Sequence, residues 1–197
     1  KITKTSPYGT VERPFNPGEL VIGAHGTFFA RSIDAEVNLT TECMVAASKH
    51  DGLSVIEVLV NCMIFNNGTH KAFAGDKEVR AEHTITLRQG EKMLFGKNMD
   101  KGLMLDNMKL KVGTGGEDGV TLDDILVHDA HEKDTMVHVM LASMKYPDFP
   151  VALGIIRDVA EPTYEREVAR QIAEVQATAK IKNVDDLLNS GETWEVE

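Results

Sequence analysis

The sequence predicts an α/β protein with a parallel sheet, flanking helices and an antiparallel strand excursion. This prediction rests on an apolar strand–helix–strand succession over residues 20–60 and on a further apolar run at residues 151–156. Strands that alternate with helices along a chain pair in parallel, because each helix returns the chain to the same end of the sheet. Short alternating segments between residues 80 and 112 are typical of hairpins and predict the antiparallel part.

The first predicted strand–helix–strand unit lies in the N-terminal third of the chain. Residues 20–24 form a short apolar run beside glycines and are predicted to be a buried strand. Apolar residues at helical spacing then predict a helix over residues 33–50, with Ser32 or Asp34 as its N-cap. Residues 54–60 follow as a β-branched run, and their continuous apolarity predicts a strand that is covered on both faces.

The chain changes character after residue 65, and we expect two parts. Residues 1–65 would belong to the α/β domain, and residues 66–197 to an extension with hairpins, a further buried strand and a C-terminal helix. Within the extension, residues 121–144 are predicted to be helical and residues 151–156 to be the buried strand. A long amphipathic helix is predicted after Pro162, since proline is tolerated in the first turn of a helix.

Composition excludes several classes of protein. The 197 residues carry 31 acidic and 21 basic side chains and a formal net charge of −10, so the phosphate backbone of a nucleic acid would be repelled. No apolar run approaches the roughly 18 residues of a membrane-spanning helix. Two cysteines cannot form a disulfide framework, and no secretory signal opens the sequence. We therefore expect a cytoplasmic protein that acts neither in a membrane nor on nucleic acid.

Two motifs invite a functional interpretation that their details do not support. Residues 113–119 are rich in glycine, but Asp118 stands where the dinucleotide-binding pattern requires its third glycine, so a flexible connector is predicted. His128, His131 and His138 lie among acidic residues, and the first two could share a helical face and bind a divalent metal. No glutamate occupies the position that a zincin motif requires. A solvated acidic helix is the preferred interpretation.

The two cysteines differ in their predicted surroundings. Cys43 lies inside the predicted helix, where a free thiol packs as a small apolar side chain. Cys62 follows the predicted strand 54–60, and open α/β sheets bind ligands at the carboxyl ends of their strands. From the residues alone, Cys62 is either packed or part of a site. Glu57, inside the same apolar strand, needs a partner if it is buried.

Several stretches resemble one family when they are taken in order along the chain. They are TSPYGT at 5–10, FNPGEL at 15–20, GAHGTFFARS at 23–32 and HDGLSVIEVLVNC at 50–62. The later stretches LFGK at 94–97, LVHD at 126–129, YPDFP at 146–150 and EPTY at 161–164 fit the same family. It is the β subunit of the thiamine-diphosphate-dependent 2-oxoacid:ferredoxin oxidoreductases, and the resemblance is greatest to the 2-oxoglutarate type.

The resemblance implies that the chain is the C-terminal half of such a subunit and holds half of a thiamine-diphosphate-binding fold. The family's first half carries a Gly-Asp-Gly motif and an asparagine for the magnesium diphosphate, and a Cys-x-x-Cys pair for a [4Fe–4S] cluster. None of these motifs stands in this sequence. Cys62 matches the family's late cysteine, the fourth cluster ligand. His25 and Arg31 follow the first predicted strand, where His25 would face a cofactor or a partner subunit, or be a structural histidine.

The resemblance also implies a reaction. The intact enzyme would oxidatively decarboxylate 2-oxoglutarate, or a similar 2-oxoacid, to the acyl-CoA and pass electrons through iron–sulfur clusters to ferredoxin. Its cofactors would be thiamine diphosphate, Mg²⁺ and [4Fe–4S], and its partners an α subunit, ferredoxin, the 2-oxoacid and coenzyme A. We expect the chain alone to bind no cofactor, to be inactive, and to self-associate through an unpaired sheet edge. The alternative is a non-catalytic α/β interaction scaffold whose acidic surface docks a partner.

Overall fold

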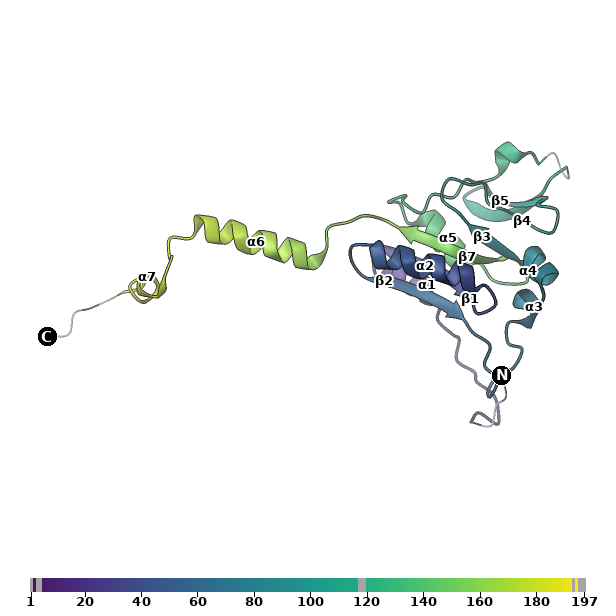
Figure 1. Ribbon diagram of the computed structural model, residues 1–197, viewed down its shortest axis with the longest axis horizontal. Coiled ribbons are helices and arrows are strands. Elements are labelled where there is room, and N and C mark those ends of the chain that lie inside the picture. Colours follow the sequence, from purple (N-terminus) through teal and green to yellow (C-terminus); the bar gives the residue numbers. More distant parts are fainter. Residues whose placement is uncertain (1, 3–4, 117–119, 193, 195–197) are drawn as a thin grey trace. The chain divides into compact units, whose positions relative to one another are not determined.

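A computed structural model describes residues 2, 5–116, 120–192 and 194 of the chain (Figure 1). The chain divides into two compact units, Lys1–Glu161 and Pro162–Glu197, and each is described here by itself. The first unit holds every strand found among the described residues, in one sheet of four strands and another of three. The glycine-rich connector predicted at residues 113–119 lies partly outside the described residues, because 117–119 are not among them.

A mixed four-stranded sheet forms the centre of the first unit. Its spatial order is β2 (Ser54–Leu59), β1 (Phe28–Ile33), β7 (Val151–Asp158) and β3 (Thr84–Leu87). The pairs β1–β2 and β3–β7 are parallel, while β1 and β7 are antiparallel. The predicted α/β class is therefore confirmed, and one antiparallel pairing joins two parallel pairs within the sheet.

The first strand of the βαβ unit lies later in the sequence than predicted. Residues 20–24 do not form a strand, because most of them belong to helix α1 (Pro17–Gly23). The side chain of Asn16 accepts the Gly18 N–H, and proline stands in the first turn, so the local start signals of a helix prevail over a short apolar run. The strand is β1 instead. Helix α2 (Val37–Lys49) follows it and ends near residue 50, as predicted.

Two further details of this unit differ from the predictions. Helix α2 has Glu36 as its N-cap rather than Ser32 or Asp34, because Ser32 still belongs to β1. Strand β2 forms as predicted, but all six of its residues are only half-buried. It stands at the edge of the sheet, and both of its faces are covered only in part: Val55 packs against one core cluster, and Ile56 and Leu59 pack against the other. The fully buried strand is β1, which has a neighbour on each side.

The core occupies both faces of the central sheet. Phe29 packs with Ile22 of α1 and with Leu141 of α5 (Met136–Ser143). Phe28 packs with Leu39 and other residues of α2. Adjacent residues of a strand point to opposite faces, so α1 and α5 cover one face of the sheet and α2 covers the other (Figure 1).

The antiparallel excursion is confirmed for its later strands only. Strands β4 (Leu94–Phe95), β5 (Lys101–Asp106) and β6 (Lys109–Thr114) form a separate antiparallel sheet. Strand β3 was predicted to belong to this group, but it pairs with β7 in the central sheet. Two short helices, α3 (Lys71–Ala74) and α4 (Lys77–His83), lead from the loop after β2 into β3.

The helix predicted over residues 121–144 is mostly absent. A 3₁₀ turn, η1 (Leu122–Asp124), and α5 are its helical parts. Between them the backbone pairs with residues 91–93 instead: the His128 N–H donates to the Glu91 carbonyl at 2.9 Å, and the Met93 N–H to the Leu126 carbonyl at 2.8 Å. These bonds to a neighbouring segment satisfy the backbone groups that a helix would otherwise pair internally.

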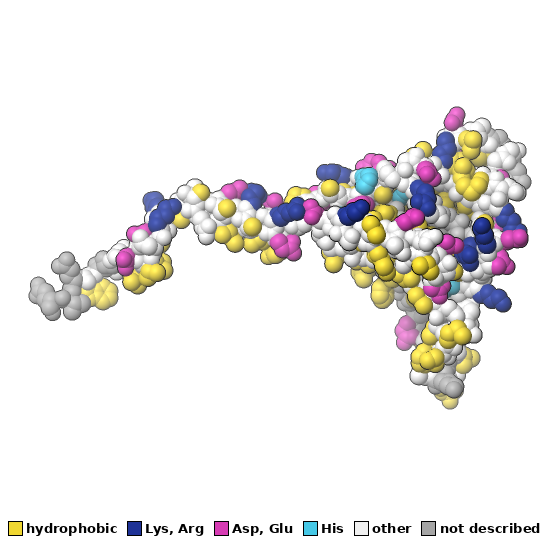
Figure 2. All heavy atoms as spheres, viewed as in Figure 1, with side chains coloured by type: hydrophobic (Ala, Val, Ile, Leu, Met, Phe, Trp, Pro, Cys, Tyr) yellow, Lys and Arg dark blue, Asp and Glu magenta, His cyan; other side chains and the backbone are white. Residues whose placement is uncertain are grey.

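The second unit holds two helices, α6 (Tyr164–Thr178) and α7 (Val184–Leu188). Helix α6 begins after Pro162 as predicted, and the Thr163 hydroxyl caps it by accepting the Arg166 N–H. Hydrophobic side chains gather along one side of α6, and most of the charged side chains in view lie along the other (Figure 2). None of the described helices, in either unit, combines the length and the apolarity that crossing a bilayer requires.

Candidate functional site: a strand-end loop and the cavity beside it

The parallel strands β1 and β2 end at the same edge of the sheet, and hydrogen bonds join the segments that follow them. After β1, the Asp34 N–H donates to the Leu59 carbonyl at 3.1 Å. The Asp34 carboxylate in turn accepts the N–H of Asn61 at 2.9 Å. These bonds extend the β1–β2 pairing beyond the strands and determine where the loop of residues 60–70, here called the strand-end loop, leaves the sheet.

Cys62 lies at the start of the strand-end loop and is partly exposed. Its Sγ accepts the Phe65 N–H at 3.4 Å, and its carbonyl accepts the Asn66 N–H at 2.9 Å. The cysteine therefore sits in a tight turn at the carboxyl end of a parallel strand, where the sequence places it. It is not packed in the core as Cys43 is.

The strand-end loop carries a group of exposed apolar side chains. Met63, Ile64 and Phe65 follow Cys62 directly, and Ile64 is 86% exposed. Val60, on the other side of Cys62, is exposed as well. Contiguous exposed apolar side chains mark surfaces that contact other proteins. The surroundings of Cys62 thus have the character of an interface.

A cavity of about 920 Å³ adjoins the strand-end loop. The loop contributes Thr69 and His70 to its lining, and β2 contributes Glu57 and Leu59. The remaining lining residues come from the segment around α1, from β1, α3 and β7, and from the segment after α5: Pro14, Phe15, Asn16, Pro17, Glu19, Leu20, Arg31, Ala72, Phe73, Met144, Lys145, Tyr146 and Val151. Most of these side chains are apolar, so the cavity suits a largely apolar occupant.

A buried ion pair stands in the wall of this cavity. Arg31 Nε donates to Glu57 Oε2 at 2.6 Å, and their side chains are 6% and 18% exposed. Arg31 Nη2 also donates to the Ala142 carbonyl at 3.1 Å, at the end of α5. Arg31 is therefore the partner that the sequence required for Glu57. The same guanidinium connects β1, β2 and α5.

His25 does not lie where the sequence argument placed it. It follows helix α1 rather than a strand, is exposed, and has a positive φ of 60°. Arg31, which was expected to follow the first strand, is instead inside β1. The premise that both follow a strand at the edge of a cleft is wrong, because the apolar run before them forms α1. The cofactor role of His25 stays a prediction.

The three histidines of residues 128–138 do not share a helical face. His128 Nε2 contacts the Ile155 carbonyl at 2.8 Å, and His131 Nδ1 contacts the Asp158 carbonyl at 2.5 Å. His138 Nδ1 accepts from Arg157 Nη1 at 2.9 Å. Burial lowers the pKa of both His128 and His138. The described residues hold no cluster of three potential metal ligands, and these histidines attach α5 and the segment before it to β7.

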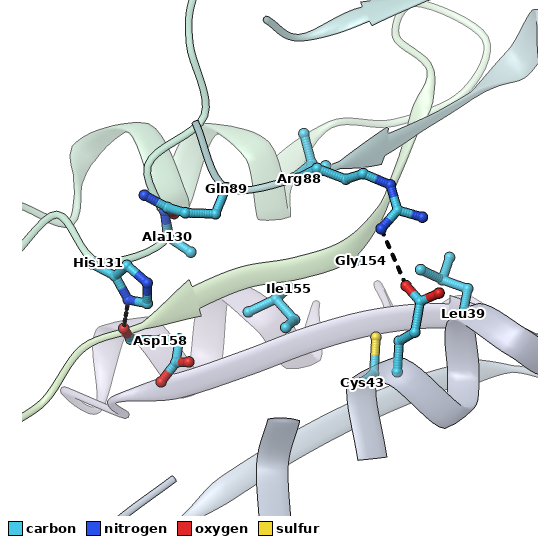
Figure 3. A pocket seen from close by; sticks show the side chains of 11 residues that line it. Leu39, Cys43, Arg88, Gln89, Ala130, His131, Gly154, Ile155 and Asp158 are labelled. Carbon is cyan, nitrogen blue, oxygen red and sulfur yellow. Dashed lines mark hydrogen bonds and ion pairs between the residues drawn. The ribbon is translucent and has the colours of Figure 1, made fainter. Parts of the chain in front are cut away.

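Cys43 lines a second, smaller cavity of about 220 Å³ between α2 and the ends of β3 and β7 (Figure 3). Its side chain is 1% exposed, and burial raises the pKa of its thiol. At the rim, Arg88 Nη1 forms an ion pair with Glu42 at 3.2 Å. The prediction that Cys43 packs as a small apolar residue is confirmed.

Neither the anchoring role of Arg31 nor the bracing role of Asn61 is predicted from the sequence. A charged side chain in a run as apolar as residues 28–33 was the available signal for Arg31, parallel to that for Glu57. For Asn61 the sequence holds no comparable signal, because its partners are set by the shape of the strand-end loop.

Comparison with known proteins finds similarity to subunits of 2-oxoglutarate oxidoreductases. It is homologous to the KorB subunit of 2-oxoglutarate oxidoreductases over its whole length. With "2-oxoglutarate oxidoreductase subunit KorB" of Mycobacterium tuberculosis the identity is 33% over 200 aligned positions. This alignment covers all of the present chain and 52% of that protein. With "2-oxoglutarate synthase subunit KorB" of Archaeoglobus fulgidus the identity is 42% over 60 positions, 30% of this chain and 22% of that one.

A solved structure shares the fold. The 2-oxoglutarate:ferredoxin oxidoreductase from Magnetococcus marinus, determined with 2-oxoglutarate, coenzyme A and succinyl-CoA bound, superimposes with a TM-score of 0.57 at 16% identity. The match covers 96% of this chain and 48% of that chain. The present chain thus spans about half the length of the full-length relatives it matches. No family model matches the sequence.

Proposed function

We propose that this chain is the C-terminal part of the β subunit of a 2-oxoacid:ferredoxin oxidoreductase. The intact enzyme would oxidatively decarboxylate 2-oxoglutarate, or a similar 2-oxoacid, to the acyl-CoA and deliver the electrons to ferredoxin. The observation that carries this proposal is the alignment of the entire chain with half of a KorB subunit. The position of Cys62 supports it independently, since a partly exposed thiol follows a parallel strand at its carboxyl end.

In this proposal Cys62 contributes one ligand to a [4Fe–4S] cluster. The donor fits the group, because such clusters are held by cysteine thiolates, and the Sγ already accepts an N–H as cluster sulfurs do. Cys43, on the buried face of α2, is no second ligand from this chain. The cluster supplies one-electron transfer when it is bound. The other three thiolates would come from the part of the subunit that the sequence does not include.

Thiamine diphosphate and Mg²⁺ fit the described residues less well. No group of three acidic, histidine or cysteine side chains among them is arranged to hold a metal ion. In the cavity beside the strand-end loop, Arg31 is neutralised by Glu57 and is not left for a diphosphate. We therefore assign the binding of both to the rest of the subunit. This chain contributes a wall of the site, and His25 is its one candidate contact.

The exposed apolar residues of the strand-end loop would then contact the rest of the enzyme, including the α subunit. In the intact enzyme, other parts of the assembly would cover these side chains, so the proposal accounts for their exposure in this chain. The same exposure would favour self-association of the chain when it is alone.

The test is an anaerobic preparation of the full-length subunit together with its α subunit. We expect coenzyme A-dependent reduction of a viologen dye with 2-oxoglutarate, and the broad visible absorption of iron–sulfur clusters. Cys62→Ala should remove the β-subunit cluster signal and the turnover, whereas Cys43→Ala should keep both. The chain of residues 1–197 alone should show no turnover.

Two results would contradict the proposal. A full-length product without cluster absorption would favour the non-catalytic scaffold. A cluster that survives Cys62→Ala unchanged would remove Cys62 from the ligand set.

A further inference from the structure

The side chain of Asn61 braces the strand-end loop from inside. Its Oδ1 accepts the Gly68 N–H at 2.8 Å, and its Nδ2 donates to Asn67 Oδ1 at 3.0 Å and to Met63 Sδ at 3.1 Å. One side chain thus joins the second residue after the strand to the far side of the turn, seven residues later.

Asn61 is itself held from the sheet. Its backbone N–H donates to the carboxylate of Asp34 at 2.9 Å, and Asp34 is bonded through its own N–H to Leu59. The sheet edge, Asn61 and the far side of the turn therefore form one continuous hydrogen-bonded unit. The loop is exposed and carries few buried apolar side chains, so these polar bonds take the place of a core in setting its shape.

The braced turn determines the surroundings of the neighbouring sulfur. The turn places the Phe65 N–H 3.4 Å from Cys62 Sγ, and the Cys62 carbonyl accepts the Asn66 N–H. An N–H directed at a cluster-ligating sulfur stabilises the reduced, more negative state of the cluster, so hydrogen bonds to sulfur raise the reduction potential. The Phe65 N–H keeps this position only while residues 61–68 keep their turn.

We propose that Asn61 is a positioning residue that sets the reduction potential of the cluster to which Cys62 contributes. It does not touch the cluster. It acts by holding the turn in which the Phe65 N–H donates to Cys62 Sγ. This inference rests on the proposed function, because it requires Cys62 to be a cluster ligand.

The experiment is a redox titration of the full-length enzyme, followed by electron paramagnetic resonance of the β-subunit cluster. In Asn61→Ala the turn loses its brace, and we expect a more negative midpoint potential. A shift of about 59 mV in the midpoint potential corresponds to a tenfold change in the one-electron reduction equilibrium. Asn67→Ala removes a single partner of Asn61 and should shift the potential in the same direction by less. Asn98→Ala, at an exposed asparagine between β4 and β5, is the matched control and should shift nothing.

The outcomes separate this inference from the proposed function. The role of Asn61 is overturned if Asn61→Ala and Asn67→Ala both hold the cluster at an unchanged potential. If Cys62→Ala loses the cluster in the same experiment, the proposed function still stands. If Asn61→Ala does not assemble the cluster, the shift in Asn67→Ala alone decides. A merely structural role for Asn61 would lower the unfolding temperature of the subunit and leave the midpoint potential of the assembled cluster unchanged.

Discussion

Arg31 on β1 and Glu57 on β2 stand directly opposite each other in the parallel register of the two strands, and their side chains form a buried ion pair. Each residue alone would be an isolated charge in an apolar strand. Together they connect the buried strand of the sheet to its edge strand. The Ala142 carbonyl at the end of α5 takes a further bond from the same guanidinium.

Removal of one partner of this pair should destabilise the fold. Glu57→Ala leaves the guanidinium of Arg31 buried without a countercharge, and we expect the free energy of unfolding to fall by about 3 kcal/mol. Glu42→Ala breaks the exposed pair with Arg88 and should cost less than about 1 kcal/mol. Denaturant unfolding of the 197-residue chain compares the two, and equal losses would show that the Arg31–Glu57 pair is not a structural anchor.

Stability should fall on mild acidification because of His128 and His138. Burial lowers the pKa of both in the folded state, so the unfolded chain takes up protons first as the pH falls. Their contribution is complete above the unfolded pKa of about 6.5 and declines between that value and the lower folded pKa, by at most about 1.4 kcal/mol per pH unit for each group.

The measurement is the unfolding midpoint between pH 7.5 and pH 5. His138→Gln should flatten the profile over this range, whereas the exposed His25→Gln should leave its slope unchanged. Parallel profiles for His138→Gln and the unsubstituted chain would count against a lowered pKa for His138.

The two cysteines should differ in their reactivity toward thiol reagents. Cys62 is partly exposed, while Cys43 is buried and its thiol pKa is raised, so less of the reactive thiolate forms. In the native chain we expect iodoacetamide to modify Cys62 and to spare Cys43, as peptide mass spectrometry would detect. Both should react in denaturant. Equal modification of the two in the native state would mean that the face of α2 that carries Cys43 is not packed against the sheet.

Gly154 in β7 should not tolerate a side chain. Its φ is +99°, and a Cβ there would lie 2.6 Å from the Leu87 carbonyl oxygen of the neighbouring strand β3. Gly154→Ala should therefore destabilise the chain by about 1–3 kcal/mol. Gly23→Ala, at the end of α1 where a Cβ meets no atom within 4 Å, is the control and should cost nothing measurable. Thermal unfolding of the two variants compares them, and a neutral Gly154→Ala would contradict the close approach of β3 and β7.

The sequence predicted elements well where a local signal and the tertiary environment agree. Helix α2, strand β2 and helix α6 formed within a few residues of their predicted bounds, because apolar spacing and, for α6, the proline start act locally. It failed at residues 20–24, where five apolar residues suit a helix as well as a strand and the cap by Asn16 decided. It failed again at residues 121–144, where pairing with residues 91–93 replaced a helix.

By itself, the sequence determined the α/β class, helix α2 with strand β2 after it, and the position of Cys62 after that strand, since these follow from periodicity and from order along the chain. Only the tertiary structure decided that β2 is an edge strand and that Arg31 is the partner of Glu57. It also decided that Asn61 braces the turn around Cys62. Pairings between residues distant in sequence depend on strand order and register, which local spacing does not encode.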